Sequence, residues 1–112
     1  MDVLAGYAYV AARTSGLLVV NIANPSAPQL AAQAAARDSA ASISVADGYA
    51  FLASSSYLST ANGLQIFDIQ TPTAPEELSF LPSPGMYCGS VAVSGSNVFL
   101  TDDKYLVDIA EF

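Results

Sequence analysis

GYAYVA at residues 6–11 and GLLVVNI at residues 16–22 are the two apolar blocks on which the fold depends. They return in the same order as GYAFLA at residues 48–53 and GLQIFDI at residues 63–69. A looser third copy reads SNVFLT at residues 96–101 and YLVDI at residues 105–109. Self-similarity at a fixed spacing marks a repeat architecture. Two blocks in a fixed order, written three times, therefore predict three structural repeats.

Turn signals separate the blocks. NPSAP at residues 24–28 and TPTAP at residues 71–75 follow the first two long blocks, and proline there must end a strand because it fixes φ and lacks a ladder donor. ISV at residues 43–45 and VAV at residues 91–93 alternate like strands, and each precedes a hairpin connector. Residues 1–3 align with 43–45, so we expect the chain to begin inside the corresponding strand of the first repeat.

Four short antiparallel strands per repeat, at a period in the low to middle forties, are typical of a β-propeller blade. In the second repeat we expect strands A to D near 43–46, 49–53, 64–69 and 77–81. The predicted fold class is all-β: one segment over residues 1–112 with just under three four-stranded antiparallel blades. Blade 1 spans about 1–41, blade 2 about 42–89 and a partial blade 3 about 90–112. A parallel β-helix and a β-sandwich are the alternatives. The coils of a parallel β-helix are usually shorter and its strands do not form hairpins, and a β-sandwich would not repeat the same two blocks three times.

Composition excludes several function classes. Hydrophobic residues make up 53% of the chain and charged residues 12%, and the formal net charge is -7. With Lys+Arg 3 against Asp+Glu 10, there is no basic patch for nucleic acid. No apolar run approaches the roughly 20 residues of a membrane span, and the first residues do not resemble a signal peptide. The single Cys and the absence of His exclude an internal disulfide, the usual zinc sites and His-based triads. We expect no enzyme activity, no cofactor and no metal.

Three groups of residues have both a functional and a structural interpretation. Asn21, Asp68 and Asp108 sit near the end of strand C, where they either supply calcium ligands or accept N–H bonds from the following turn. The turn interpretation is favoured, because the dense Asp-rich loops of calcium sites are missing. Asp102 and its acidic neighbour are read as solvated turn residues, with acid/base chemistry as the alternative. Cys88 has no cationic neighbour in sequence and is read as a half-buried structural residue.

The spacing between repeats varies in the connections that leave one end of a blade. The offset rises from 42 to 47 residues across the B-to-C connection of blade 2, which places five extra residues within 54–62. The D-to-A connections, read as residues 34–41 and 82–89, are also long. Binding residues tend to lie on loops held by a rigid frame. An exposed aromatic can anchor a partner, although packing into the channel mouth is the favoured interpretation for Met86 and Tyr87. The predicted binding surface comprises Arg13, Arg37, Tyr57, Met86, Tyr87 and Asp102.

The YLVDI block, its relatives at residues 17–22 and 64–69, and the flanking NPSAP turn resemble the LVIVD repeat of bacterial and archaeal proteins. The resemblance covers almost the whole chain and implies a propeller, often on secreted or surface-attached proteins. It therefore implies an extracellular or cell-surface location. Asn21 departs from the pattern, since the motif usually has Asp there, and the third copy lacks a final turn and D strand.

Fewer than three blades cannot close a ring, because propellers need roughly four to eight. We therefore expect a homo-oligomer, with a dimer of six blades favoured and a trimer also able to close if partial blades merge. The expected function is a non-enzymatic scaffold or adhesion module that binds a protein or a glycan on its loop-rich face. The alternative is a propeller lectin with sugar sites between blades. A hydrolase ranks third, because propeller hydrolases place His around the channel and this chain has no His.

Overall fold

A computed structural model describes residues 1–57, 61–83, 87–101 and 108–111, the last range as backbone alone. The described residues form three antiparallel sheets. Sheet one contains β1 (Asp2–Leu4), β2 (Tyr7–Ala11), β3 (Leu17–Asn21) and β4 (Gln29–Ala34). Sheet two contains β5 (Ser39–Ala46), β6 (Tyr49–Ser55), β7 (Gly63–Asp68) and β8 (Glu76–Pro82). Sheet three contains β9 (Ser90–Ser94), β10 (Asn97–Thr101) and β11 (Asp108–Glu111).

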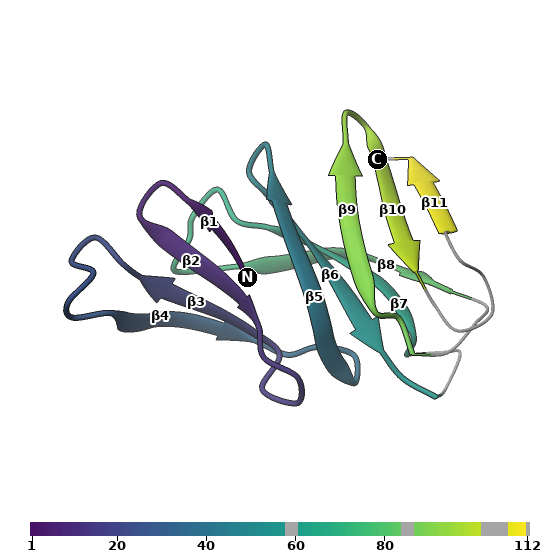
Figure 1. Cartoon of the computed structure of the whole chain (residues 1–112), viewed down its shortest axis with the longest axis horizontal. Coiled ribbons are helices and arrows are strands. Elements are labelled where there is room, and N and C mark those ends of the chain that lie inside the picture. The colour runs from purple at the N-terminus through teal and green to yellow at the C-terminus, as the bar shows by residue number, and fades with distance from the viewer. Residues whose placement is uncertain (58–60, 84–86, 102–107, 112) are drawn as a thin grey trace.

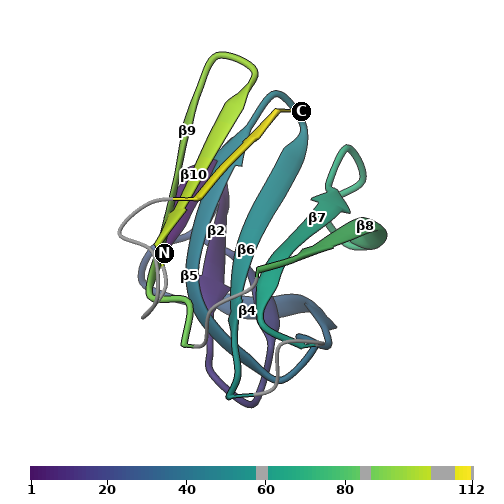
Figure 2. The same cartoon turned by 90° about the vertical axis from the view of Figure 1, so that its right-hand side faces the viewer.

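Each sheet is a meander in which consecutive strands are neighbours, and the three sheets stand side by side along the long axis of the molecule (Figures 1 and 2). This arrangement confirms the predicted fold class of four-stranded antiparallel propeller blades, two of them complete. We call the sheets blade 1, blade 2 and blade 3. No helix in the described part of the chain is long and apolar enough to cross a membrane.

The A-to-B hairpins have the same register in all three blades. Tyr9, Phe51 and Phe99 stand at the same place in strand B, as the repeat spacing predicts, and their partners in strand A are Asp2, Ser44 and Ala92. In the first two hairpins both central turn residues have positive φ, with 51° and 84° in blade 1 and 53° and 80° at Asp47 and Gly48 in blade 2. Such a type I′ turn matches the twist of paired strands.

Two boundaries differ from the prediction. The D-to-A connection between blades 1 and 2 spans only residues 35–38, not 34–41, because β5 begins at Ser39. The extra pairs Ser39–Ser55 and Ala40–Ser54 extend the hairpin past an irregularity before Ser42. The C strand of blade 3 was predicted at residues 105–109; the described strand β11 is Asp108–Glu111, and residues 105–107 lie outside the described part. Strand β11 pairs with β10 alone in the described sheet, so that one ladder sets its register.

The core lies between the blades. One cluster joins Tyr9, Leu17 and Val19 of blade 1 to the facing side of blade 2, and a second joins Phe51 and its neighbours to blade 3. The middle strands of blade 2 are therefore buried on both faces, which explains their nearly continuous apolar sequence. The high hydrophobic fraction of the chain follows from this stacking of sheets.

A glycine opens strand C in both complete blades because the D strand passes very close to it. A Cβ on Gly16 would lie 2.2 Å from the carbonyl oxygen of Ala34, and a Cβ on Gly63 would lie 2.2 Å from that of Leu81. Only a residue without a Cβ fits at these two positions. The glycine that begins each GL block therefore allows strands C and D to come this close together.

Candidate functional site

The B-to-C and D-to-A connections leave the same end of the blades, the lower end in Figure 1. We call this end the loop face, formed by residues 12–16, 35–38, 56–57, 61–62, 83 and 87–89. Four of the six predicted binding residues lie on it and are exposed: Arg13, Arg37, Tyr57 and Tyr87. Met86 and Asp102 lie outside the described residues. The opposite end carries the tight A-to-B turns (Figure 2).

A buried amide holds the loops of blade 2 together. Asn62 is fully buried, and its Oδ1 accepts hydrogen bonds from the backbone N–H of Ser56 at 3.1 Å and of Cys88 at 2.9 Å. Its backbone carbonyl accepts a third bond from the N–H of Ser83 at 2.7 Å. The B-to-C connection and the connection into blade 3 are thus joined through one side chain. A buried amide whose hydrogen bonds are all made is a rigid link, because breaking those bonds leaves buried polar groups without a partner.

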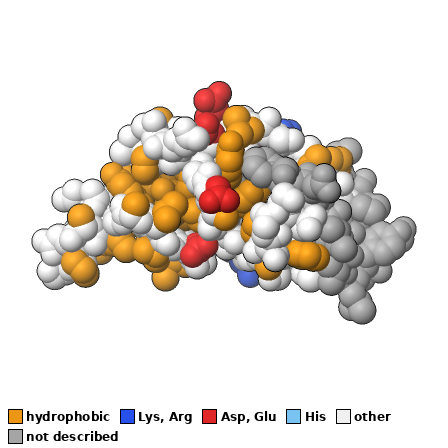
Figure 3. Space-filling view, turned by 90° about the horizontal axis from the view of Figure 1, so that it is seen from above, with side chains coloured by type: hydrophobic (Ala, Val, Ile, Leu, Met, Phe, Trp, Pro, Cys, Tyr) orange, Lys and Arg blue, Asp and Glu red, His pale blue; other side chains and the backbone are white. Residues whose placement is uncertain are grey.

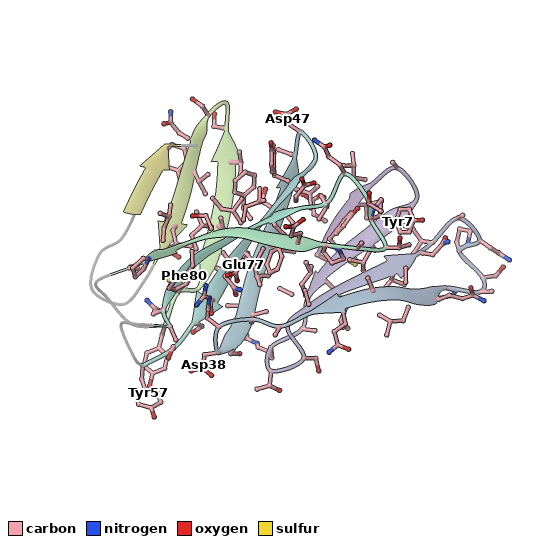
Figure 4. The ribbon with its side chains drawn as sticks, turned by 180° about the vertical axis from the view of Figure 1, so that it is seen from behind. Tyr7, Asp38, Asp47, Tyr57, Glu77 and Phe80 are labelled. Atoms are coloured by element: carbon pink, nitrogen blue, oxygen red, sulfur yellow. The ribbon has the colours of Figure 1, made fainter. Side chains whose placement is uncertain are left out.

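The same link brings the two tyrosine-bearing segments together. The N–H of Tyr87 donates to the carbonyl of Ser56 at 3.0 Å. Because Ser56 directly precedes Tyr57, this bond holds the two tyrosine-bearing segments side by side. Tyr57 is 62% exposed and Tyr87 is 57% exposed, and Tyr57 projects from the end of the molecule in Figure 4. Tyr87 has a φ of 56°, a left-handed conformation that costs a bulky L-residue roughly 1–2 kcal/mol. Such strain is maintained only where surrounding contacts fix the backbone.

Arg37 is engaged within the chain. Its Nη2 lies 2.5 Å from Oε1 of Glu77, and its guanidinium carbon lies 4.7 Å from the centre of the Phe80 ring. The backbone N–H of Arg37 donates to Oε1 of the buried Gln65 at 2.9 Å. Figure 4 shows Glu77 and Phe80 above the connection that carries Asp38. Arg37 therefore fastens the D-to-A connection to strand β8, and half of its side chain stays in contact with solvent.

Arg13 belongs to the loop face through its backbone. Its N–H and carbonyl exchange hydrogen bonds of 2.9 and 2.8 Å with Ala40 of blade 2, and its φ is 53°. Two of the three basic residues of this acidic chain, Arg13 and Arg37, thus lie on one face. The contacts of Glu77 offset the charge of Arg37, which leaves Arg13 as the more available cation.

The turn interpretation of the polar residues near the end of strand C is confirmed at two positions. Oδ1 of Asn21 accepts the N–H of Ala23 at 2.9 Å, and Oδ1 of Asp68 accepts the N–H of Gln70 at 2.9 Å. The side chain of Asp108 lies outside the description. Within the described residues no group of three acidic, Cys or His side chains is placed to hold a metal ion.

Cys88 is structural, as predicted, but it is buried to 1% exposure and not half-buried. It belongs to the cluster between blades 2 and 3. The predicted solvated turn residues Asp102 and Asp103 lie outside the described part of the chain. Asp38 is exposed on its connection.

Sequence reasoning missed Asn62 and Gln65. Gln65 is 1% exposed, and its Nε2 donates to Oε2 of Glu77 at 2.5 Å and to the carbonyl of Ala35 at 3.3 Å. One signal was available: Gln65 interrupts an otherwise apolar strand at the position where blade 1 has Leu18. A polar residue in a strand buried on both faces needs a partner, although the sequence does not say which.

Comparison with known proteins agrees with this architecture. The family model described as LVIVD repeat matches residues 1–35 and 38–80, which cover blade 1 and blade 2 up to strand β8. No curated protein and no solved structure is significantly similar to the chain. The two matched ranges together span more than half of the 112 residues. The repeated blocks, the blades they form and the match over both complete blades show that the chain belongs to the LVIVD repeat family.

Proposed function

We propose that this chain is a non-enzymatic interaction module at the cell surface or outside the cell, part of a propeller ring completed by self-association. Its loop face binds a protein or a glycan through Tyr57 and Tyr87. The observation that supports this most directly is the Asn62 link, which holds two exposed tyrosines on neighbouring loops.

The physical case rests on preorganisation. Tyrosine supplies a large contact area at a low conformational cost and keeps a hydroxyl for hydrogen bonding. Loops fixed before binding lose less entropy when a ligand arrives. The bonds from Ser56 and Cys88 to Asn62 fix the backbone on both sides of the tyrosine pair. Arg13 on the same face favours a ligand with some negative charge.

The first test is a glycan array probed with the wild-type chain and with a Tyr57→Ala/Tyr87→Ala double variant. A second arm uses a displayed random-peptide library, so that a peptide ligand is also detected. Loss of both anchors should weaken any selected ligand about 30-fold or more, which corresponds to roughly 2 kcal/mol. Leu78→Ala is the matched control, because Leu78 is 50% exposed on strand β8. Glycans and peptides that bind the double variant as well as the wild type would refute the role of the tyrosines.

A second candidate, the inter-blade lectin, is favoured by one cavity. A pocket of about 320 Å³ lies between blades 2 and 3 at the A-to-B turns, and it is lined by Ala46, Asp47, Tyr49, Phe51, Val93, Gly95 and Ser96. Its volume is at the lower end for small-molecule sites. An aromatic ring beside a carboxylate and a hydroxyl suits a sugar, whose apolar face stacks while its hydroxyls donate and accept.

The two sites are separable because they lie at opposite ends of the blades. If glycans bind the pocket, Asp47→Ala should abolish binding while the Tyr57→Ala/Tyr87→Ala variant retains it. If they bind the loop face, the pattern reverses. Glycan binding unaffected by either change would exclude both sites.

A further inference from the structure

The pocket of about 320 Å³ between blades 2 and 3 lies between two neighbouring A-to-B hairpins, and every residue that lines it belongs to the described part of the chain. Tyr49 and Phe51 are two residues apart in strand β6, so both side chains point toward blade 3. The wall on the blade 3 side includes Gly95 and Ser96, whose small size leaves room beside the aromatic residues. Two aromatic side chains thus lie opposite a wall of small residues.

The two aromatic side chains differ in how much surface they offer to a ligand. Phe51 is 2% exposed and belongs to the core cluster between blades 2 and 3. Tyr49 packs against the same cluster but is only partly buried. A partly exposed aromatic ring provides a large apolar contact area together with a polar tip. Tyr49 is therefore the side chain on which the apolar C–H face of a sugar ring can stack.

Asp47 gives the pocket a carboxylate that its turn does not require. The first residue of the same turn is Ala5 in blade 1 and Gly95 in blade 3, with φ of 51° and 60° against 53° at Asp47. The backbone thus adopts a positive φ here with three different side chains, so the carboxylate is not needed to form the turn. Asp47 is exposed, and within the described part of the chain its carboxylate takes part in no hydrogen bond or ion pair. It is therefore available to a ligand.

The electrostatic surroundings of the pocket favour a cation. The chain has a formal net charge of -7, and Arg13 and Arg37, the basic residues of the described part, lie on the loop face. Figure 4 shows Asp47 at the tip of its hairpin, at the opposite end of the molecule from Tyr57. Seen from the end that carries the A-to-B turns, acidic side chains stand near the middle of the surface and basic ones reach only its rim (Figure 3). An acidic surface attracts cations, and a hydrogen bond to an ionised partner is roughly twice as strong as a neutral one.

We propose that this pocket binds a sugar that carries a free primary amine, a hexosamine of the glucosamine type. The C–H face of the sugar lies on Tyr49, its ammonium group pairs with Asp47, and the hydroxyl of Ser96 exchanges a hydrogen bond with a hydroxyl of the sugar. This inference rests on the second candidate function, the inter-blade lectin, and names its ligand. A ligand of this size with one charged contact at an exposed carboxylate binds weakly, with a Kd on the order of 1 mM.

Amide chemical shifts of the isotope-labelled full chain, followed by NMR during titration, test the proposal. The probes are glucosamine, N-acetylglucosamine, glucose and methylammonium, at about pH 6, where a primary amine is protonated. Glucosamine should shift the signals of Ala46, Gly95 and Ser96 and leave that of Arg13 in place. The two neutral sugars should bind at least about 5-fold more weakly, as expected for the loss of one exposed charge pair. Methylammonium should also bind more weakly, because it has no sugar ring to stack on Tyr49.

Two matched variants separate the pocket carboxylate from the general charge of the chain. Asp47→Asn removes the charge and keeps a residue that tolerates positive φ, and it should weaken glucosamine binding about 5-fold, to the level of glucose. Asp38→Asn removes one exposed carboxylate at the opposite end of the blades and should leave glucosamine binding unchanged. Ser96→Lys places an ammonium group in the pocket and should also weaken glucosamine binding, which provides an independent variant if Asp47→Asn does not fold.

Each other outcome overturns a defined part of the reasoning. Glucose and glucosamine that bind equally well at these signals overturn the choice of ligand and leave the inter-blade lectin standing. Methylammonium that binds as tightly as glucosamine overturns the role of the sugar ring. Equal weakening by Asp47→Asn and Asp38→Asn shows a general charge effect and overturns the contact with Asp47. If no sugar shifts the signals of the pocket, both this inference and the inter-blade lectin are refuted, and the proposal for the loop face is unaffected.

Discussion

Gly63→Ala should destabilise the fold, because Gly63 is buried where strand β8 passes close to strand β7. The added Cβ would lie 2.2 Å from the carbonyl oxygen of Leu81 and 2.9 Å from both the Cα of Pro82 and the N of Ser83. All three atoms are backbone, so no side chain can rotate away. Real Cβ contacts stay beyond about 3.0 Å, so strand β7 or β8 must move by at least 0.8 Å, the difference between 3.0 and 2.2 Å.

The magnitude follows from the contacts that this shift disturbs. Overpacking of a close-packed site costs roughly 1–3 kcal/mol, and loss of the adjacent bond from Ser83 N–H to the carbonyl of Asn62 adds about 1 kcal/mol. Replacing glycine lowers the entropy of the unfolded chain and returns about 0.4–1 kcal/mol. A net loss of about 1–3.6 kcal/mol, against an unfolding entropy of about 0.24 kcal/mol/K for a chain of this size, lowers Tm by about 4–15 °C.

The assay is thermal unfolding followed by circular dichroism at one fixed chain concentration. Gly89→Ala is the matched control: Gly89 has no positive φ, and among the described residues its Cβ would meet only Oγ1 of Thr101, at 3.7 Å. Its Tm should stay the same or rise by up to about 4 °C. A Gly63→Ala protein that melts within 3 °C of the Gly89→Ala protein would show that the close approach of strand β8 does not require glycine.

Three further predictions concern buried or capping polar groups. Asn62→Ala leaves the N–H groups of Ser56 and Cys88 unsatisfied and should lower the free energy of unfolding, measured in urea, by about 2–4 kcal/mol. Thiol labelling of Cys88 should also become faster. A loss below about 1 kcal/mol would contradict the role of Asn62 as a link. Asp68→Asn keeps the oxygen that accepts the turn hydrogen bond and should change the free energy of unfolding by less than about 0.5 kcal/mol, while Asp68→Ala should lower it by about 1 kcal/mol. A rise in the Tm of the wild-type chain on addition of calcium would overturn the turn role. Burial raises the pKa of the Tyr9 phenol above 10.0, and the neighbouring tyrosine adds to it. The unfolded chain then loses its proton first, so stability should fall as pH rises above about 10, and Tyr9→Phe should reduce that fall.

Much of the site lay beyond sequence reasoning because it depends on contacts between distant segments. Packing into the channel mouth was the favoured interpretation for Tyr87, which is instead 57% exposed. Nothing local shows that Ser56 and Tyr87 share a hydrogen bond. Arg37 was predicted only as a loop residue of the binding surface, and the fold places Glu77 and Phe80 beside it. Blade packing decides both, since it sets which loops meet.

The sequence by itself determined the repeat, the strand order and the register of the hairpins. These features depend on local chemistry: period-two alternation, the Asp47–Gly48 type of turn and the prolines that end strand C all act within a few residues. The tertiary structure alone decided which face of each blade is covered and how Asn62 and Gln65 are satisfied. It also placed the start of strand β5 at Ser39, through the backbone pairing of Ala40 with Arg13 of the preceding blade. Such contacts join residues many positions apart, and their energies depend on burial, which no local pattern of side chains records.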